Sequence, residues 1–458
     1  MSETSQSSRG GPERGGQRGR AVLVLVLAVL AGLGLGRFLS YDGAVGAPAP
    51  APAVAAARGD LASEAAALEA AVARDPADLR SLQALGAVHI ARAAETGDPS
   101  YYGSARSAFD RADAVVRDDP ETLLGRGLLA LALHEFDAAE ELGERALRAR
   151  PDNPSVLGVL VDAQVEQGRY EEAAATLQAM LDQRPALPAL ARTSYVRQLH
   201  GDLDGAVLAM EQARAAGSPR PYDRAVVSTL LGDLYLQRGD LDAAGDAYDE
   251  ALRDAPGLVN AGVGRARVLE ARGDTAAAVR LLQDVTERQP APAPLLLLAD
   301  LQASTGDASG AASTRELVRA IAGLQESAGQ VVDLEMALFE ADTGDPERAV
   351  ERARRAHAAR PDNVFTQDAL AWALHRAGRS AEALPLAQQA LRLGTAEPSL
   401  RYRAASVLAA NGEREAAAAA LRGMTGARWF SVAYRADAAA LAADLGVPAP
   451  AEWTSPVS

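Results

Sequence analysis

Apolar residues recur along most of the chain at spacings of three and four positions, separated by polar positions. This period is typical of α-helices that bury one face. The amphipathic segments come in pairs, and a glycine separates the two members, as Gly239 and Gly273 do. Glycine tolerates the positive φ at which helices often end. Three pairs show the pattern best: 225–256, 259–290 and 364–394. The pattern therefore predicts an all-α protein built from helical hairpins.

The hairpins repeat at a fixed period. Pro151 and Pro185 are 34 residues apart, and so are Pro256 and Pro290. A period of that length indicates an α-solenoid, because one helix pair cannot bury its apolar face until it stacks on the next pair. We expect about ten pairs after a lone helix at 60–75. Their turns are expected near Gly97, His134, Gly168, Gly201, Gly239, Gly273, Gly306, Gly344, Gly378 and Gly412.

Four segments depart from the period. Extra residues at 97–104 enlarge the first pair, and the seventh pair runs irregularly into 323–330, which indicates a bend or a seam between subdomains. A final helix at about 430–445 is expected to cap the last pair. A disordered tail is expected at 447–458, because this segment is rich in proline and serine. The solenoid is therefore expected to occupy residues 59–446.

The framework residues resemble those of the tetratricopeptide repeat (TPR). In the pair at 225–256 the matching residues are Leu231, Gly232, Tyr235, Ala244, Tyr248, Ala251 and Pro256. Ser228 stands where the family has an aromatic residue. The resemblance implies a right-handed superhelix whose concave groove is lined by the first helix of each pair. It also implies that this groove binds extended peptides or helices.

The phase of the repeat assigns residues to that groove. The candidate protein-binding residues are Phe365, Asp368, Trp372, His375, Arg376, Tyr402, Arg403, Tyr195 and Arg267, and Asp233 and Glu270 share their phase. Aromatic residues together with arginine are typical of a binding anchor. The alternative is that Trp372 packs between neighbouring repeats, because tryptophan is often buried. Its burial and its binding are therefore separate hypotheses for this residue.

The N-terminal 58 residues differ from the repeats. Residues 1–20 are polar and carry four arginines, and we expect a disordered cytoplasmic arm there. Residues 21–41 begin with sixteen apolar or small residues and are expected to form one transmembrane helix. Residues 42–58 are rich in alanine and proline and predict a semi-rigid spacer.

The charges around the apolar segment predict its orientation. The basic flank stays in the cytoplasm, so the body of the protein is expected outside it, on a single-pass anchor in the cell membrane. An uncleaved signal anchor is favoured over a signal peptide cleaved near Ala44 to Gly46, which would release the body as a secreted protein.

The composition excludes several classes of chemistry. All 46 basic residues are arginine, so no lysine is available for a phosphate loop or a Schiff base, and no cysteine is available for a disulfide or a thiolate metal site. The five histidines fall in different repeats. Asp202 and Asp204 lack the further ligands of a calcium loop and are expected to cap a helix. We therefore expect no enzymatic activity, metal, cofactor or small-molecule substrate.

The charge balance indicates the kind of partner. The formal net charge of −15 opposes nucleic-acid binding and favours a neutral or basic protein segment. The leading expectation is a membrane-anchored extracytoplasmic scaffold for protein–protein interaction. Two alternatives stay open: an assembly chaperone for envelope or secreted proteins, resembling the anchored repeat subunits of cytochrome c maturation, and a structural spacer.

Overall fold

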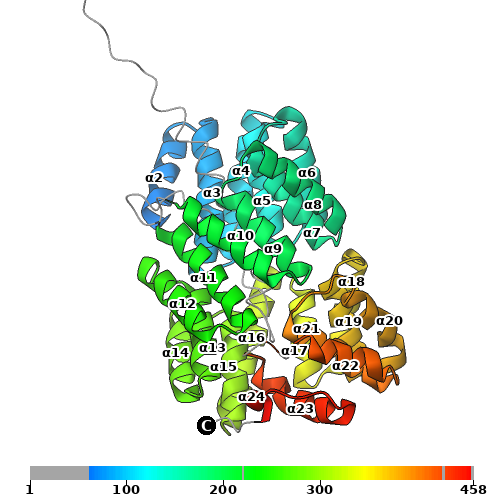
Figure 1. Ribbon diagram of the computed structural model, residues 1–458. Helices are drawn as coiled ribbons and strands as arrows, with labels where there is room; N and C mark the ends of the chain where they lie inside the picture. The colour runs from blue at the N-terminus through cyan, green and yellow to red at the C-terminus, as the bar shows by residue number, and fades with distance from the viewer. Residues whose placement is uncertain (1–60, 219–220, 425, 427–428, 455–458) are drawn as a thin grey trace, which may run out of the picture.

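The computed structural model describes residues 61–218, 221–424, 426 and 429–454. Within these residues every regular element is a helix, as the sequence predicts (Figure 1). The lone first helix is α2 (Leu61–Arg74). Ten helix pairs follow: α3 (Leu79–Thr96) and α4 (Ser100–Val115); α5 (Pro120–Ala132) and α6 (Phe136–Ala149); α7 (Pro154–Glu166) and α8 (Tyr170–Gln183); α9 (Leu187–Leu199) and α10 (Leu203–Ala216); α11 (Pro221–Arg238) and α12 (Leu241–Asp254); α13 (Val259–Ala271) and α14 (Thr275–Arg288); α15 (Pro292–Ser304) and α16 (Ala308–Ser327); α17 (Asp333–Thr343) and α18 (Pro346–Ala359); α19 (Val364–Arg376) and α20 (Ser380–Ala390); and α21 (Pro398–Ala410) and α22 (Arg414–Arg422).

The ten turns lie at the positions that the glycines predict. Each turn contains a residue at positive φ, which is glycine in nine turns and His134 (φ 64°) in the second. Positive φ is strained for a residue with a Cβ. Contacts on both sides hold His134 there: its Nδ1 lies 2.8 Å from the carbonyl oxygen of Val331, and its ring stacks on Phe136. The expected cap is also confirmed at Asp202, which accepts a hydrogen bond of 2.9 Å from the Gly205 amide.

Close approach of the helices depends on small residues at fixed repeat positions. Tyr248 of α12 is fully buried, with Gly232 of α11 and Gly264 of α13 beside its ring. A Cβ on Gly232 would lie 2.7 Å from that ring, and one on Gly264 would lie 2.2 Å from it. Phe109 of α4, in the first pair, fills the equivalent space beside Gly86 of α3 and Gly125 of α5. Aromatic bulk on one helix therefore requires glycine on two others.

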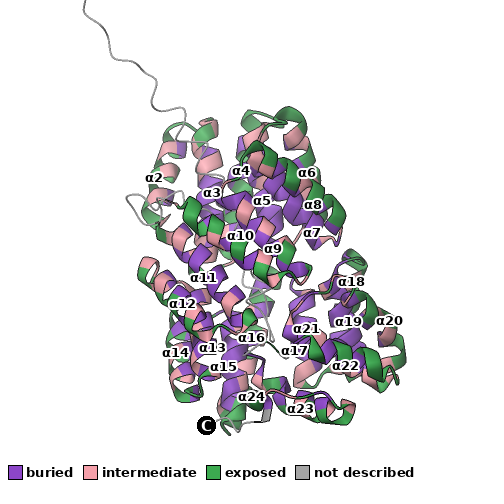
Figure 2. Cartoon of the chain, viewed as in Figure 1, coloured by how far each residue is buried: buried purple, intermediate pink, exposed green. Residues whose placement is uncertain are grey.

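The first helix of a pair is more deeply buried than the second. Twelve of the 13 residues of α7 are buried, against four of the 14 residues of α8. Figure 2 shows the same contrast between α19, which is largely buried, and the exposed outer faces of α20 and α22. The first helices are enclosed because they pack against their partners, against neighbouring pairs and against distant parts of the chain.

The array folds back on itself with a constant offset of six pairs. The turns of the first four pairs contact the loops that precede α15, α17, α19 and α21 respectively. The contacting residues are Gly97 and Gln289, His134 and Val331, Gly168 and Asp362, and Gly201 and Gly394. Each contact joins residues 192 to 197 positions apart. The second half of the solenoid therefore stacks on the first half, as the proximity of α7 to α18 shows in Figure 1.

The third turn makes the most extensive of these contacts. Arg360 donates to the carboxylate of Glu166 at 2.8 Å, and both side chains are buried. The side-chain amide of Asn363 donates to the carbonyl oxygen of Glu166, also at 2.8 Å, and the Val364 amide donates to the Tyr170 hydroxyl at 3.0 Å. Buried hydrogen bonds of this kind fix the register, because a shift of one residue leaves their polar groups without partners.

The irregular segment after the seventh pair is one of the stacking contacts. Helix α16 has 20 residues, whereas most second helices have 14. The chain then passes through Val331, whose amide donates to the carbonyl oxygen of Leu133 at 3.2 Å. The bend expected from the sequence therefore brings the eighth pair against the turn of the second pair.

The C-terminal segment differs from its prediction. Helix α23 (Val432–Leu445) was expected only to cap the last pair, but it also packs against α15 (Figure 1). The segment expected to be disordered from residue 447 contains the short helix α24 (Ala451–Thr454), in which Trp453 is 4% exposed. Burial of Trp453 and Val447 orders residues that proline and serine content alone predict to be disordered.

The predicted membrane anchor at 21–41 lies outside the described residues. The arm at 1–20, the spacer at 42–58 and residues 59 and 60 lie outside them too. None of the helices between residues 61 and 454 is both long enough and apolar enough to span a bilayer. The described ranges consist of the repeat array and the C-terminal segment that packs on it.

Candidate functional site

The groove predicted from the repeat phase is occupied by the chain's own C-terminus. Residues 429–453, here called the C-terminal segment, contact the first helices of five successive pairs: α13, α15, α17, α19 and α21. We call the surface that these five helices present to the segment the groove. The segment binds it through arginine and aromatic side chains, which are the residue types that dominate protein-binding hot spots.

The α13 end of the groove holds the segment by charge. Arg435 makes a bidentate ion pair with Glu270, with hydrogen bonds of 2.6 and 2.7 Å, and its Nε donates to the carbonyl oxygen of Phe430 at 2.7 Å. Both charged side chains are buried. One turn earlier on α13, the guanidinium of Arg267 lies 4.6 Å from the centre of the Trp429 ring. Charge-assisted bidentate bonds are among the strongest in proteins and fix orientation as well as distance.

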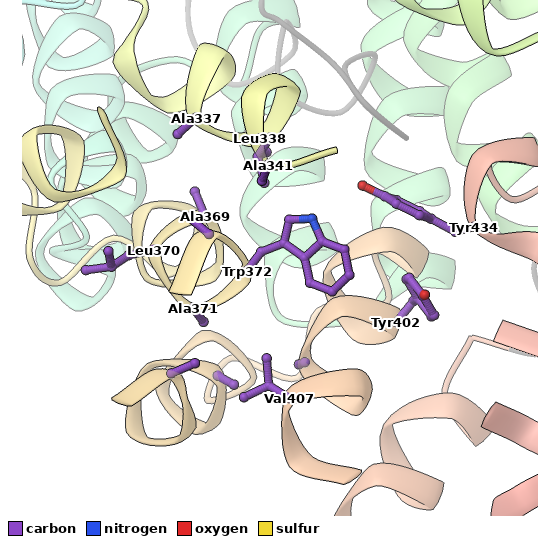
Figure 3. Close-up of a cluster of buried hydrophobic side chains, with 14 of the residues drawn as sticks. Ala337, Leu338, Ala341, Ala369, Leu370, Ala371, Trp372, Tyr402, Val407 and Tyr434 are labelled. Carbon is purple, nitrogen blue, oxygen red and sulfur yellow. The ribbon is translucent and has the colours of Figure 1, made fainter. Parts of the chain in front are cut away.

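The α17–α21 end of the groove is aromatic. The Trp372 ring lies 6.0 Å from both Tyr402 and Tyr434, and the two tyrosine rings are 5.0 Å apart (Figure 3). Phe430 stacks near Tyr402 at 5.7 Å and near Trp453 at 5.4 Å. Trp372 is 3% exposed, which agrees with the packing alternative for this residue. Two residues from first helices and three from the C-terminal segment therefore form one cluster.

A single carboxylate organises this cluster. Asp342 of α17 accepts a hydrogen bond of 2.8 Å from the Trp372 indole and another from the Tyr434 hydroxyl. Burial raises the pKa of Asp342, although these two hydrogen bonds favour its charged form. Asp342 thus joins a residue of the groove to a residue of the segment, and no repeat position predicts this link.

Two other predicted groove residues pair with each other. Arg403 of α21 donates to Asp368 of α19 at 2.5 and 3.1 Å, and both side chains are buried. The carboxylate of Glu397 nearby accepts hydrogen bonds from the Ser399 and Leu400 amides and caps α21. Asp368 and Arg403 therefore connect the ninth pair to the tenth, and their charges are satisfied inside the repeat array.

The remaining predicted residues are spread over different surroundings. His375 stacks on Trp372 at 5.4 Å, and burial lowers the pKa of its imidazole. Arg376 is exposed, and its Nε donates to the carbonyl oxygen of Ala341 at 3.2 Å. Phe365 and Tyr195 pack into the apolar cluster where the ninth pair meets the third and fourth pairs, and Phe365 also packs against the cluster that contains Trp372. The nine predicted residues thus do not form one surface.

A polar cavity lies where the C-terminal segment crosses α15 and α17. Its volume is about 360 Å³, and its lining includes Asp300, Asp342, Arg315, Ala433 and Tyr434. Burial raises the pKa of Asp300 to about 7, and the negative charge of Asp342 acts in the same direction, whereas Arg315 at 3.5 Å opposes the shift. Across the described ranges, no three histidine or carboxylate side chains converge as metal ligands would.

The C-terminal residues are the functional contacts that repeat phase does not assign. A compositional signal was present: aromatic residues make up only 4% of the chain, yet Trp429, Phe430 and Tyr434 fall within six positions. The sequence places these rings near the last helix. It does not show that they contact α13, because Arg435 is separated from Glu270 by 165 residues.

Models of the tetratricopeptide repeat match the chain in several places. One model matches residues 130–193 and 235–301, a second matches 100–154 and 197–259, and a third matches 365–389. These regions include parts of most of the ten helix pairs. The expectation of repeats of this type is confirmed.

Two curated proteins are similar to more than half of the chain. Cellulose synthase 2 operon protein C of Komagataeibacter xylinus is 30% identical over 267 residues, which are 56% of this chain and 18% of that protein. Cellulose synthase operon protein C of Xanthomonas axonopodis pv. citri (strain 306) is 29% identical over 318 residues, which are 57% of this chain and 20% of that protein. The similarity therefore takes in about a fifth of the length of either relative.

Solved repeat proteins are also similar. A thermophilic TPR protein of Thermus thermophilus is 28% identical and has a TM-score of 0.34, with 37% of this chain and 91% of that chain covered. A tetratricopeptide repeat protein of Parabacteroides merdae is 19% identical and has a TM-score of 0.38, with 56% and 98% covered. The family models therefore support tetratricopeptide repeats within residues 100–193, 197–301 and 365–389 of this chain.

Proposed function

We propose that this chain is a membrane-anchored scaffold outside the cytoplasm that binds another protein through the groove of α13 to α21. One observation carries the proposal: the groove already binds a polypeptide segment, with an ion pair between Glu270 and Arg435 at one end and an aromatic cluster around Trp372 at the other. A surface that buries arginine and aromatic side chains of its own chain has the chemistry to bind those of another.

The membrane part of the proposal rests on the sequence. Residues 21–41 carry the apolar run, and the arginines of residues 1–20 favour a cytoplasmic N-terminus. Reporter fusions after Ser458 test it. A reporter that is active only outside the cytoplasm should be active, and one that is active only inside should be silent. The reverse pattern would place the groove in the cytoplasm and remove this part of the proposal.

The names of the relatives suggest where a partner is to be sought. Both are called cellulose synthase operon proteins, and their aligned parts cover more than half of this chain. We therefore propose a polysaccharide-synthesis assembly of the cell envelope as the first place to search. The partner segment itself is expected to be neutral or basic, because the groove contributes Glu270, Asp342 and Asp300.

Site-specific photo-cross-linking on intact membranes tests the interaction. A cross-linking amino acid replaces Arg376, which is exposed beside Trp372, and in a matched control it replaces Leu208, which is 55% exposed on the outer helix α10. A scaffold gives a discrete, stoichiometric adduct from position 376 and none from 208. Many transient adducts would instead favour an assembly chaperone. The same adducts from both positions, or none from either, would contradict binding through the groove.

A further inference from the structure

The contact between the groove and the C-terminal segment is not required by repeat stacking. Helix α23 contacts the last pair, and its Tyr434 and Arg435 side chains also reach Asp342 and Glu270, which are 92 and 165 positions away. Each first helix of the groove also packs against its own second helix and against the neighbouring pair. The segment therefore adds a contact to a surface that the stacked pairs already form.

The C-terminal segment leaves one part of the groove unfilled. The cavity of about 360 Å³ lies under Ser431 to Tyr434, and Asp300 and Asp342 both line it. Asp300 forms an ion pair with Arg315 at 3.5 Å, which is a long distance for such a pair. Ala433 lines the same cavity with an exposed methyl side chain, which fills little of the space. Two carboxylates and one guanidinium, that of Arg315, line this cavity, so carboxylates are in excess at a position where the segment offers no charge.

We propose that the groove is a docking site for a segment of another protein that carries aromatic residues and arginine at the spacing of Trp429, Phe430, Tyr434 and Arg435, with an additional basic residue at the position of Ala433. This proposal deepens the function proposed above and rests on it. The C-terminal segment holds the groove closed by the same contacts, so the partner gains access only by replacing it. The basic residue supplies the partner's advantage, because it enters the acidic cavity that the resident segment leaves open.

The competition has a simple quantitative form. A partner binds only molecules whose C-terminal segment has left the groove, so its apparent dissociation constant is the intrinsic one divided by the open fraction. Loss of the bidentate Arg435–Glu270 pair leaves Glu270 buried without its cation, which destabilises the closed state. A change on the segment side thus opens the groove and leaves the docking surface intact, whereas a change at Glu270 opens it and damages it.

Peptide binding to the full chain tests the proposal. The probe is a fluorescently labelled peptide with the sequence of residues 426–454, and its binding is followed by anisotropy. The Arg435→Gln chain should bind the peptide at least tenfold more tightly than the unchanged chain does. The Glu270→Gln chain should gain much less, although its segment is also released. Arg253→Gln, at an exposed position on α12, is the matched control and should behave as the unchanged chain does.

The partner's basic residue has its own test. A peptide in which Ala433 is replaced by lysine should bind the Arg435→Gln chain at least fivefold more tightly than the unmodified peptide does. This gain should disappear when the chain also carries Asp300→Asn, because the cavity then lacks the carboxylate that the lysine faces. An equal gain with and without Asp300 would overturn the assignment of the cavity.

Several outcomes are decisive against the proposal. Equal peptide affinity of the unchanged and Arg435→Gln chains would show that the segment does not compete for the groove. If Arg435→Gln perturbs folding by circular dichroism, Tyr434→Phe replaces it, since that change removes only the hydrogen bond to Asp342, and the same gain is expected at a smaller, several-fold size. Dimers that exchange C-terminal segments, detected by light scattering, would make a second copy the occupant and refute a heterologous partner. These tests need no cellular partner, so a failed cross-linking search leaves them unaffected.

Discussion

Two buried aromatic residues, Tyr248 and Trp372, make similar hydrogen bonds but have different neighbours. Each donates a hydrogen bond to an aspartate: the Tyr248 hydroxyl to the buried Asp233 at 2.6 Å, and the Trp372 indole to the half-buried Asp342 at 2.8 Å. Burial raises the pKa of both carboxyl groups, that of Asp233 to about 7. The difference lies in what completes each core. The Tyr248 ring lies beside glycines of its own pair and the next, and Trp429 joins only its wider apolar cluster, whereas the Trp372 ring lies directly beside Tyr434 of the C-terminal segment.

The two residues therefore differ in how far along the sequence the neighbours of their rings lie. Glycine on α11 and α13 leaves room for Tyr248, so the tightest contacts of its ring come from sequence within one pair on either side. The surroundings of Trp372 depend on a segment that follows two further helix pairs and approaches across α13 and α15. Substitutions in the two cores should therefore respond differently to the state of the C-terminal segment.

The largest expected effect is at Trp372. Trp372→Ala removes the centre of the aromatic cluster and leaves Asp342 without its indole donor, so we expect the free energy of unfolding to fall by about 3–5 kcal/mol. Urea denaturation monitored by circular dichroism measures it. Arg376→Ala on the same helix is the control and should cost less than about 1 kcal/mol, because its side chain is exposed. A loss below about 1 kcal/mol for Trp372→Ala would contradict its place in the core.

The local core is tested by adding one carbon atom. The Cβ of Gly264→Ala would lie 2.2 Å from the Tyr248 ring, so the ring or a helix must move, and we expect a loss of about 1–3 kcal/mol. Gly257→Ala is the matched control, since no atom lies within 4 Å of its added Cβ. In the background of Tyr248→Ala the Gly264 change should cost much less. Equal costs with and without the tyrosine ring would show that the two residues do not share a space.

The sequence predicted most of the architecture because repeat phase is local. The turn glycines and the small-residue positions around Tyr248 all follow from a pattern within one or two pairs, and so does the buried phase of Leu231 and Ala244. The stacking of the two halves does not, because Arg360 and Glu166 are single residues without a repeated counterpart. Their contact depends on how much each pair rotates relative to the last, and that angle sums over six pairs.

Repeat phase predicted some of the residues that surround the C-terminal segment, and their role in binding a partner stays a prediction. Repeat phase assigned Arg267, Glu270, Trp372 and Tyr402 to the groove, and all four contact the C-terminal segment or its aromatic cluster. Phase cannot show what lies opposite, because the segment carries no repeat marks. The same limitation explains why the helix at 430–445 was expected only at the end of the array.

The smallest expected effect is on the pH dependence of stability, which the aspartates beside Tyr248 and Trp372 both influence. The unfolded pKa of Asp233 is near 3.8 and its folded value is about 7, so between these values the folded state holds a proton that the unfolded state has lost. The stability that Asp233 contributes is therefore full below about pH 4 and declines as the pH rises to 7. Asp233→Asn is neutral throughout, and its Oδ1 accepts the Tyr248 hydrogen bond at every pH. Relative to the unchanged chain, it should gain about 1–2 kcal/mol between pH 5 and pH 7.

Thermal melting at the two pH values measures this gain. Two further variants serve as a control and as a comparison. Asp242→Asn, whose side chain is 98% exposed, should shift both melts equally. Asp342→Asn should show a gain in the same direction, since burial also raises that pKa, but only while Tyr434 remains docked. When Arg435→Gln releases the segment, water reaches Asp342 and its pH-dependent gain should shrink, whereas the gain at Asp233 should change less, because its donor Tyr248 stays in place even though Trp429 leaves the cavity beside it. If both gains changed together, the two cores would not be independent, and the distinction between local and non-local packing would fail.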